Sequence, residues 1–550
     1  MKKVLRIFIA FTLIVSVISA DAQMRYLDDV FTNVTVTSDI QYAENISILP
    51  MLTGGQPALS PILCDIYEPT GDPLTNRPVV ILAHTGSFLP PVINGQPTGG
   101  KTDSSIVQQC MRWARKGYVA VAMSNRLGWN PTSTNQDTRT STLLQAAYRG
   151  IQDAKAMVRY LRKTEDLDGN PYGIDPNKIA LGGQGTGGYL SLGYATLDTV
   201  GDATPWAEIY LTKFFNLNTM QPYVYPPING NYDGTDSTFL PIIDSISGTI
   251  IGYAPVNIPN WPTYSNEISM AFNIGGCLAD SSWLEAGDVP MVSFHCAKDE
   301  NGPYANGDVI VPTTGQFVVE AQGSYIVQKH QAMHGNNAIF ANAGFSDAFT
   351  QASVTNNTLY DTINSYAVGN NYDGLYTFVT PAPSSTPNAF GEFYSEEGAP
   401  WDWWDNTWYD NMHQAVHSSP AGYGPANSIL GNPNMSSAKG NAYLDTIQGY
   451  LNPRMFLALG LDTIATASIE DIIDFATEIY PNPTTDKVSI VSYAATINSV
   501  EIYNINGQIV YSKNVNANTI KINTTSFSDG VYIMNIHSKK ATISRKLIVE

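Results

Sequence analysis

The sequence of 550 residues predicts an α/β protein that has a mostly parallel sheet with helices on both faces, followed by a small C-terminal all-β sandwich. Three observations predict this class. Apolar runs of strand length alternate with helix-like segments between about residues 60 and 200, which is typical of a parallel sheet. Long stretches rich in Asn, Gly, Tyr and Pro interrupt the later part of this pattern. After about residue 465, short alternating strands replace the helices.

Composition and charge indicate an exported protein and restrict its partners. Residues 1–22 begin with two lysines, continue with an apolar run and end in the small-residue pattern A-D-A, so they form a predicted signal peptide. No later stretch is apolar enough to suggest a membrane span after signal removal. The net charge of -19 repels phosphate backbones and argues against nucleic acid as a partner. The four cysteines match no zinc pattern, and we expect no metal and no cofactor.

The elements of the sheet follow from apolar runs and helical spacing. Predicted strands cover residues 77–84, 118–126, 177–183, 248–256, 288–299 and 374–381, and predicted helices cover residues 105–117, 141–163 and 188–197. We place this domain at residues 23–465. Cap insertions are expected at about 200–245 and 300–440, over the C-terminal edge of the sheet.

The strand at 177–183 leads into a turn that has the frame of a catalytic elbow. Gly183-Gln184-Gly185-Thr186-Gly187 follows a strand and precedes a helix, as G-x-S-x-G does where a strained turn presents a nucleophilic serine. Gly185 occupies the position of that serine and has no side chain that can attack. The sequence therefore predicts an elbow without its usual nucleophile.

The segments LCDIYEP, RPVVILAHTGSF, GYVAVAMSNRLG and GIDPNKIALGGQGTGGYLSL occur in this order. They resemble the secreted, carboxylesterase-like branch of the α/β-hydrolases over residues 60–310, and again near the last helix. The resemblance implies an oxyanion loop at His84, Thr85 and Gly86, with threonine in place of a glycine, and pocket positions at Gln184 and Thr186. It also implies that Asp299, within VPMVSFHCAKDENGPY, is the acid.

The base of the triad is not located in the sequence. No histidine follows the predicted strand at 374–381, where the base is expected. The pairs His330/His334 and His413/His417 have helical i, i+4 spacing, but no third ligand accompanies them, so we expect no metal there. One of these four histidines could still reach the site.

Several tryptophans cluster in the segment APWDWWDNTWYDN. Aromatic faces beside Asp and Asn suit sugar rings, so Trp401, Trp403 and Trp404 are candidates for stacking on a ligand. Packing of the insertion onto the sheet is the preferred explanation of the same residues. A glycan or a protein is therefore a possible ligand.

The C-terminal segment carries YPNP, VEIYNINGQIV, GVYIMNI and KLIV in this order. These motifs resemble the sorting domain of cargo of the type IX secretion system of Bacteroidota. We place a linker at 466–478 and the sandwich at 479–550, with a hairpin turn at Asn506-Gly507. The resemblance implies that this domain binds the secretion machinery. It also implies that the processed protein is secreted or stays at the outer cell surface.

Three hypotheses about function remain open. The first is a secreted, non-catalytic relative of esterases that binds a ligand. The second is an active carboxylester or carbohydrate-ester hydrolase with a displaced nucleophile. The third is a structural component of the cell surface.

Overall fold

The computed structural model describes residues 24–197, 213–244, 247–311, 314–364, 371–393, 395–462, 477–492, 496–504, 508–538 and 542–550. The predicted signal peptide, most of the predicted linker and the Asn506-Gly507 turn lie outside these residues. The chain forms two compact units, one up to Leu459 and one from Gly460 onward.

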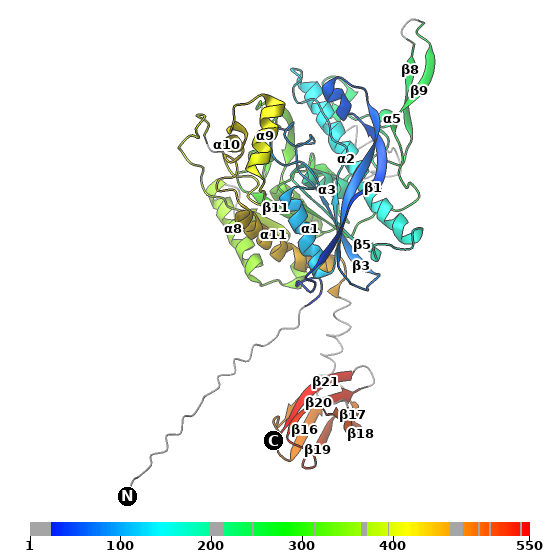
Figure 1. Ribbon diagram of the computed structural model, residues 1–550, viewed down its shortest axis with the longest axis vertical. Helices are drawn as coiled ribbons and strands as arrows, with labels where there is room; N and C mark the ends of the chain where they lie inside the picture. Colours follow the sequence, from blue (N-terminus) through cyan, green and yellow to red (C-terminus); the bar gives the residue numbers. More distant parts are fainter. Residues whose placement is uncertain are drawn as a thin grey trace. The chain divides into compact units, whose positions relative to one another are not determined.

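The first unit is built on an eight-stranded sheet with the order β1-β2-β4-β3-β5-β10-β11-β14 (Figure 1). The strands are β1 (Val34–Ser47), β2 (Ala58–Pro69), β3 (Arg77–Ala83), β4 (Val119–Met123), β5 (Ile174–Gln184), β10 (Met270–Ile274), β11 (Met291–Cys296) and β14 (Leu375–Phe378). β2 pairs antiparallel with β1 and β4, and all other pairs are parallel. This order, with an antiparallel second strand, is the α/β-hydrolase fold, so the predicted fold class is confirmed.

Helices cover both faces of this sheet. α1 (Ser104–Lys116) contacts α11 (Ser437–Ala458), and α2 (Gln136–Asp166) contacts α3 (Thr186–Thr196). The crossovers β3-α1-β4 and β4-α2-β5 run in opposite directions along the sheet, so right-handed connections place α1 and α2 on opposite faces. α1 ends where the sequence predicts, because Gly117 adopts the left-handed conformation and its N–H donates a hydrogen bond to the carbonyl oxygen of Ala114 in the last turn.

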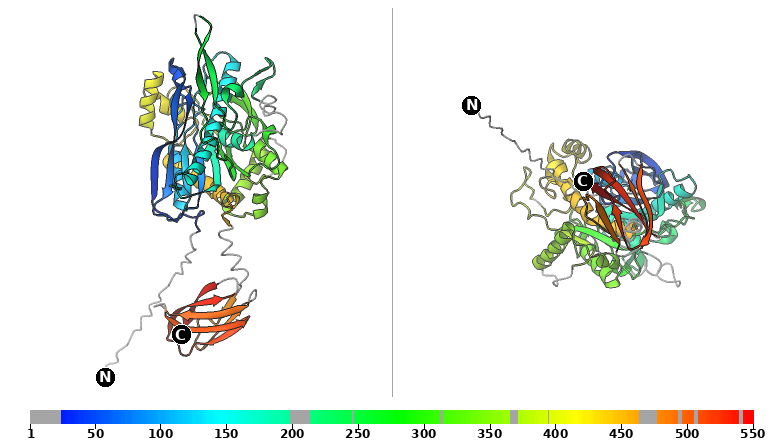
Figure 2. Two further views of the ribbon diagram at one scale, coloured as in Figure 1. Left: turned by 90° about the vertical axis from the view of Figure 1, so that its right-hand side faces the viewer. Right: turned by 90° about the horizontal axis from the view of Figure 1, so that it is seen from below.

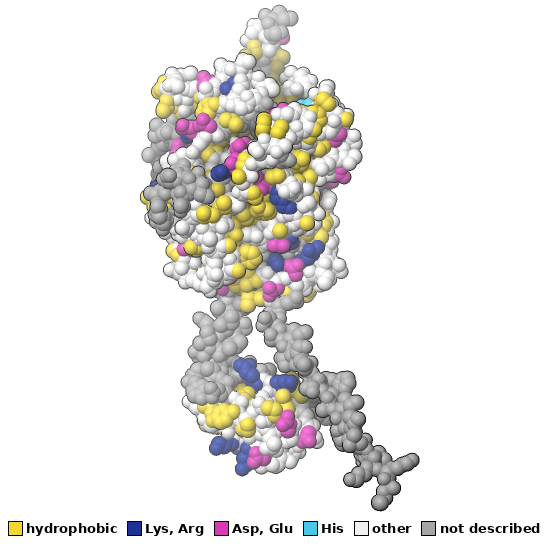
Figure 3. Space-filling model, turned by 90° about the vertical axis from the view of Figure 1, so that its left-hand side faces the viewer, with side chains coloured by type: hydrophobic (Ala, Val, Ile, Leu, Met, Phe, Trp, Pro, Cys, Tyr) yellow, Lys and Arg dark blue, Asp and Glu magenta, His cyan; other side chains and the backbone are white. Residues whose placement is uncertain are grey.

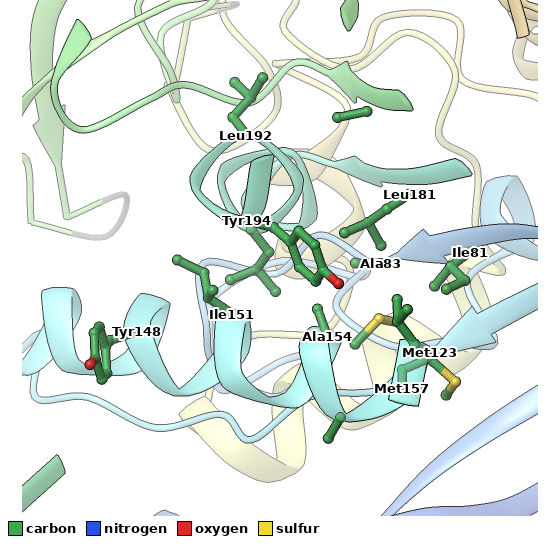
Figure 4. Packing of buried hydrophobic residues seen from close by; sticks show 14 of the residues in the cluster. Ile81, Ala83, Met123, Tyr148, Ile151, Ala154, Met157, Leu181, Leu192 and Tyr194 are labelled. Carbon is green, nitrogen blue, oxygen red and sulfur yellow. The ribbon is translucent and has the colours of Figure 1, made fainter. Parts of the chain in front are cut away.

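A cluster of buried hydrophobic side chains lies between the sheet, α2 and α3 (Figure 4). Alternate strand residues face it, since side chains alternate across a strand. The contributing side chains include Ile81, Met123 and Leu181 from the strands, and Ile151, Met157 and Leu192 from the two helices. This packing fixes the end of β5 and the start of α3, where the elbow lies.

One predicted strand belongs elsewhere. Residues 248–256 form β9 (Ile250–Asn257), which pairs only with β8 (Thr238–Ile243) in a separate hairpin. β10 takes the place in the sheet next to β5. An apolar run alone does not distinguish a buried sheet strand from an exposed hairpin strand, which explains the error.

The remaining strands and α-helices of the first unit follow β5 along the chain. They are β6 (Phe215–Asn216), β7 (Gln221–Pro222), α5 (Pro226–Asn229), β12 (Asn306–Ile310), β13 (Phe317–Gln322), α6 (Ser324–His334), α7 (Ala338–Ala343), α8 (Ala348–Asn364), α9 (Asn406–His417) and α10 (Tyr423–Ser428). Among them, α6 and α8 pack against β11 and β14. Within the described part of the chain, no helix has both the length and the apolar character that a membrane span requires.

The second unit is all-β. One sheet has the order β15-β16-β19 and the other β18-β17-β20-β21. The strands are β15 (Thr477–Tyr480), β16 (Lys487–Ser492), β17 (Ile497–Tyr503), β18 (Ile509–Ala517), β19 (Thr519–Asn523), β20 (Gly530–His537) and β21 (Thr542–Val549). Alternate residues of both sheets, such as Val488, Ile490, Val500 and Ile502, form one buried cluster, as in a β-sandwich.

Candidate functional site

The turn at Gly185 keeps the backbone of a nucleophile elbow. Gly185 joins β5 to α3 with φ 53° and ψ -118°, a conformation that side chains rarely adopt and that a strained elbow requires. Two residues on, Gly187 leaves no space for a side chain, because an added Cβ would lie 2.6 Å from the carbonyl carbon of Ala83. The close approach of helix and strand at an elbow is therefore present.

The side chain of Thr85 occupies the space in front of Gly185. A Cβ added to Gly185 would overlap the Thr85 Oγ1 atom and lie 2.9 Å from the Thr85 Cβ atom. Thr85 stands where the resembling family carries a glycine. In this backbone, a side chain at position 185 would require the Thr85 side chain to move.

Buried hydrogen bonds hold the loop that follows β3. Asn94 donates from Nδ2 to the carbonyl oxygens of Gly86 at 3.2 Å and Thr98 at 2.8 Å. Trp129 donates from Nε1 to the carbonyl oxygen of Ser87 at 2.7 Å. These side chains fix the loop backbone, and thereby hold Thr85 over the elbow.

Asp299 lies after β11, at the position implied for the acid. Its Oδ1 atom accepts backbone N–H bonds from Asn301 at 2.8 Å and Gly302 at 3.3 Å, and burial raises its pKa. Gly398, in the loop after β14, lies directly against this carboxylate: a Cβ added to Gly398 would overlap Oδ1 and lie 2.7 Å from Cγ. In a triad the base contacts the acid. Here Gly398, which lies in the region where the base is expected, is the residue against the acid.

The histidine nearest to Asp299 is His295, and its ring is engaged elsewhere. Its Nε2 atom lies 3.7 Å from Asp299 Oδ2, which is beyond hydrogen-bonding distance. Nε2 lies 3.0 Å from the carbonyl oxygen of Gly302, and Nδ1 lies 2.8 Å from Ser324 Oγ. The ring is fully buried, and burial lowers its pKa. His295 therefore supports the loop that carries Asp299.

The other histidines of this unit also lie outside the cavity at the elbow. His84 is buried, its Nδ1 atom lies 2.6 Å from the carbonyl oxygen of Thr85, and burial lowers its pKa. His413 and His417 contact Ser419 and Val92 from α9. His330 and His334 contact each other on α6. Among the described residues, no group of three or more His, Cys, Asp or Glu side chains is arranged to hold a metal ion.

The elbow opens into a cavity of about 140 Å³. Its walls are largely apolar and include Phe88, Trp129, Leu144, Ile274, Val309 and Val319. Its polar end brings together Thr85, Gln184, Gly185, Thr186 and Asp299, all of which the sequence indicates, whereas His84 and Gly86 do not line it. No histidine, lysine or arginine lines this cavity within the described chain.

Asp402 is a further lining residue that the sequence analysis did not single out. It is buried, and its Oδ1 atom accepts hydrogen bonds from the Ser105 hydroxyl at 2.6 Å and from Gln184 Nε2. Burial raises the pKa of Asp402 to about 6. Burial and the charge of Asp402 raise the pKa of nearby Asp103 to about 7. The cavity thus has an acidic end without a lining cation.

The tryptophans of the 401–408 segment separate into two groups. Trp401 is buried, lines the cavity and packs 5.9 Å from the Phe378 ring, and its Nε1 atom has no hydrogen-bond partner among the described residues. Trp403, Trp404 and Trp408 line a different, open groove of about 250 Å³.

Comparisons with known proteins concern the two units separately. No curated protein sequence matches the chain. Solved structures of Thermogutta terrifontis esterase 2 are similar to it. The form phosphorylated by paraoxon has 16% identity, covers 51% of this chain and 77% of its own, and gives a TM-score of 0.27. The propionate-bound form has 16% identity, covers 44% of this chain and 70% of its own, and gives a TM-score of 0.26.

Residues 478–550 match the secretion system C-terminal sorting domain. The C-terminal unit is therefore a sorting domain of a secretion system, and the protein is secreted or located at the outer cell surface.

Proposed function

We propose that this protein is an exported, catalytically silent member of the α/β-hydrolase fold that binds a small ligand in the cavity at its elbow. The observation that carries the proposal is the contact between Thr85 and Gly185. A threonine side chain occupies the space in which the side chain of a nucleophile would begin, and Gly185 itself offers no side chain.

The surroundings of the elbow support the same conclusion. The Thr85 hydroxyl lines the cavity, but a hydroxyl needs an adjacent base to become a nucleophile. The described cavity wall offers no histidine for this purpose, and Gly398 lies against Asp299 where a base would stand. A displaced nucleophile at Thr85 therefore lacks a histidine base to take its proton.

The cavity favours a ligand with an apolar body and a hydrogen-bond donor at one end. Aromatic and aliphatic side chains line most of it, and Asp299 and Asp402 are its two acidic lining residues. A cavity of about 150 Å³ accommodates a benzene ring. We expect an amine or an alcohol of this size to bind, and a carboxylate to be repelled by the two buried acids.

Ligand-observed NMR with benzylamine, benzyl alcohol and benzoate tests this assignment. We expect binding of the amine and the alcohol, no binding of benzoate, and no turnover of p-nitrophenyl acetate or butyrate. Ala147→Phe fills the cavity and should abolish binding, whereas Gln136→Phe, at an exposed position of the same helix, should not. Ester turnover by the wild type, or binding that survives Ala147→Phe, would refute the proposal.

A second candidate function is glycan binding in the groove formed by Trp403, Trp404 and Trp408. Trp408 is 44% exposed, and Asp103 and Asp405 line the same groove, so aromatic faces and hydrogen-bond acceptors stand together. Affinity electrophoresis in gels that contain xylan, soluble β-glucan or mannan tests it. Trp408→Ala should weaken retardation at least fivefold, and Phe393→Ala, which removes a more exposed aromatic ring elsewhere, should not. Equal effects of both variants would exclude this groove.

A further inference from the structure

The hairpin β8–β9 rises from the first unit with little cover (Figures 1 and 2). Its base is attached through α5 and β1, and its two strands pair only with each other. A two-stranded hairpin is marginally stable in water unless another surface covers one of its faces. Its side chains therefore indicate what that surface is.

The hairpin is unusually apolar for an exposed element. Between Thr238 and Asn257, Asp244 in the turn is the only charged residue. Hydrophobic side chains are visible on the projecting hairpin at the top of the molecule (Figure 3). The large exposed side chains are Phe239, Leu240, Ile242, Ile243, Ile250, Ile251 and Tyr253. A contiguous apolar surface of this kind marks an interaction site.

The register divides these residues between two faces. Residues opposite each other in the ladder share a face. Face A consists of Phe239 with Pro255, Pro241 with Tyr253, and Ile243 with Ile250. The register shifts between Ile242 and Ile243, so Ile251 has no opposite residue in the ladder and is assigned to neither face. Face B consists of Leu240 with Ala254 and Ile242 with Gly252. The large side chains of face A are 54% to 64% exposed, against 42% and 45% for Leu240 and Ile242. Face A is the more exposed surface.

Two features restrict how a partner can bind. Pro241 in β8 and Pro255 in β9 lack the N–H that an added strand would use, so extension of the sheet at either edge is unfavourable. The turn carries Asp244, whose Oδ1 atom accepts a hydrogen bond from Ser247 N at 2.6 Å, so insertion of the turn into a membrane would bury a charge. A partner must therefore pack against a face.

We propose that face A is the contact between two copies of this protein. Two copies of face A bring apolar side chains together without opposing like charges, since Asp244 at the turn is the only charged residue between Thr238 and Asn257. At about 100 Å² for each of the four large side chains per copy, the pair buries about 800 Å², in the size range of weak, transient interfaces. The contact is a weak, reversible dimer.

Sedimentation velocity of the full chain between about 1 and 200 µM tests this contact. We expect a monomer at the lower end and a dimer at the upper end. Ile243→Thr/Tyr253→Thr should weaken dimerisation at least tenfold, because threonine keeps strand propensity while removing apolar area. Leu240→Thr/Ile242→Thr makes the same type of change on face B and should shift the dissociation constant less than twofold. Unchanged tryptophan emission shows that each variant is folded.

Three results would overturn the proposal. The first is a wild type that stays monomeric at 200 µM. The second is an equal loss of dimer in the face A and face B variants. The third is co-flotation of the wild type with phosphatidylcholine or phosphatidylglycerol vesicles that the face A variant abolishes, since the hairpin would then bind membranes.

Discussion

The hydroxyl of Thr85 stands where the side chain of residue 185 would begin, and the two positions are therefore complementary. Gly185 keeps the strained backbone of an elbow, with φ 53° and ψ -118°, although it has no side chain to present. This conformation is a property of the β5–α3 packing, because glycines such as Gly183 allow helix and strand to approach. The elbow thus remains as a structural turn that forms one wall of the cavity.

This complementarity predicts a coupling between the two positions. Gly185→Ser should lower the free energy of unfolding by about 2 kcal/mol, from overlap with Thr85 and from the left-handed backbone. Thr85→Gly removes the overlap. The free energy of unfolding of the double variant should therefore be about 1 kcal/mol higher than the sum of the two single effects predicts. Urea unfolding followed by tryptophan fluorescence measures this in the first unit, since all nine tryptophans precede residue 460. Additive effects would mean that the overlap is relieved by movement of the loop.

The buried carboxylate of Asp402 should make stability depend on pH. Its pKa, raised by burial to about 6, exceeds that of an unfolded aspartate, so its contribution is complete below about pH 4 and is lost as the pH rises through 6. Asp402→Asn should flatten this dependence and stabilise the protein at pH 8 by about 3 kcal/mol, with little change at pH 4. The exposed Asp308→Asn serves as the control in the same urea titrations. If the free energies of unfolding of the wild type and of Asp402→Asn changed in parallel with pH, the pH dependence would not come from Asp402.

The same carboxylate should control the affinity for an amine. Benzylamine is a cation between pH 5 and 8, so it should bind about tenfold more tightly as Asp402 ionises across this range. Benzyl alcohol should show little dependence on pH, and Asp402→Asn should remove the dependence for benzylamine. Isothermal titration at several pH values measures both ligands. An equal pH dependence for the alcohol would show that the cavity itself changes with pH.

Much of the central sheet could be predicted because buried parallel strands have continuous apolar runs. Residues 77–84 and 118–126 are of this kind, and β3 and β4 lie within them. β10 was missed, because its short run MAFNI is flanked by Ser269 and Gly275 and stands near the longer run of β9. The apolar hairpin β8–β9 misled the prediction, since exposure of such a run depends on its tertiary surroundings.

Candidate site residues could be named from the sequence where a local motif defines them. Gly185, Thr85, Gln184 and Thr186 belong to turns whose frame is visible in the sequence, and the structure brings them together with Asp299. Asp402 and Gly398 were not identified, because they come from the loop after β14. The path of this loop is determined by packing against α1 and Asp299, for which no short motif exists.

Active-site labelling of the full-length wild type tests the central claim most directly. The protein is incubated with a fluorophosphonate probe, and adducts are located by mass spectrometry of the intact chain and its peptides. We predict no adduct, because Gly185 has no side chain and no histidine of the described cavity wall can activate the Thr85 hydroxyl. A stoichiometric adduct on Thr85, Ser105 or any other residue would contradict the account and show an active hydrolase.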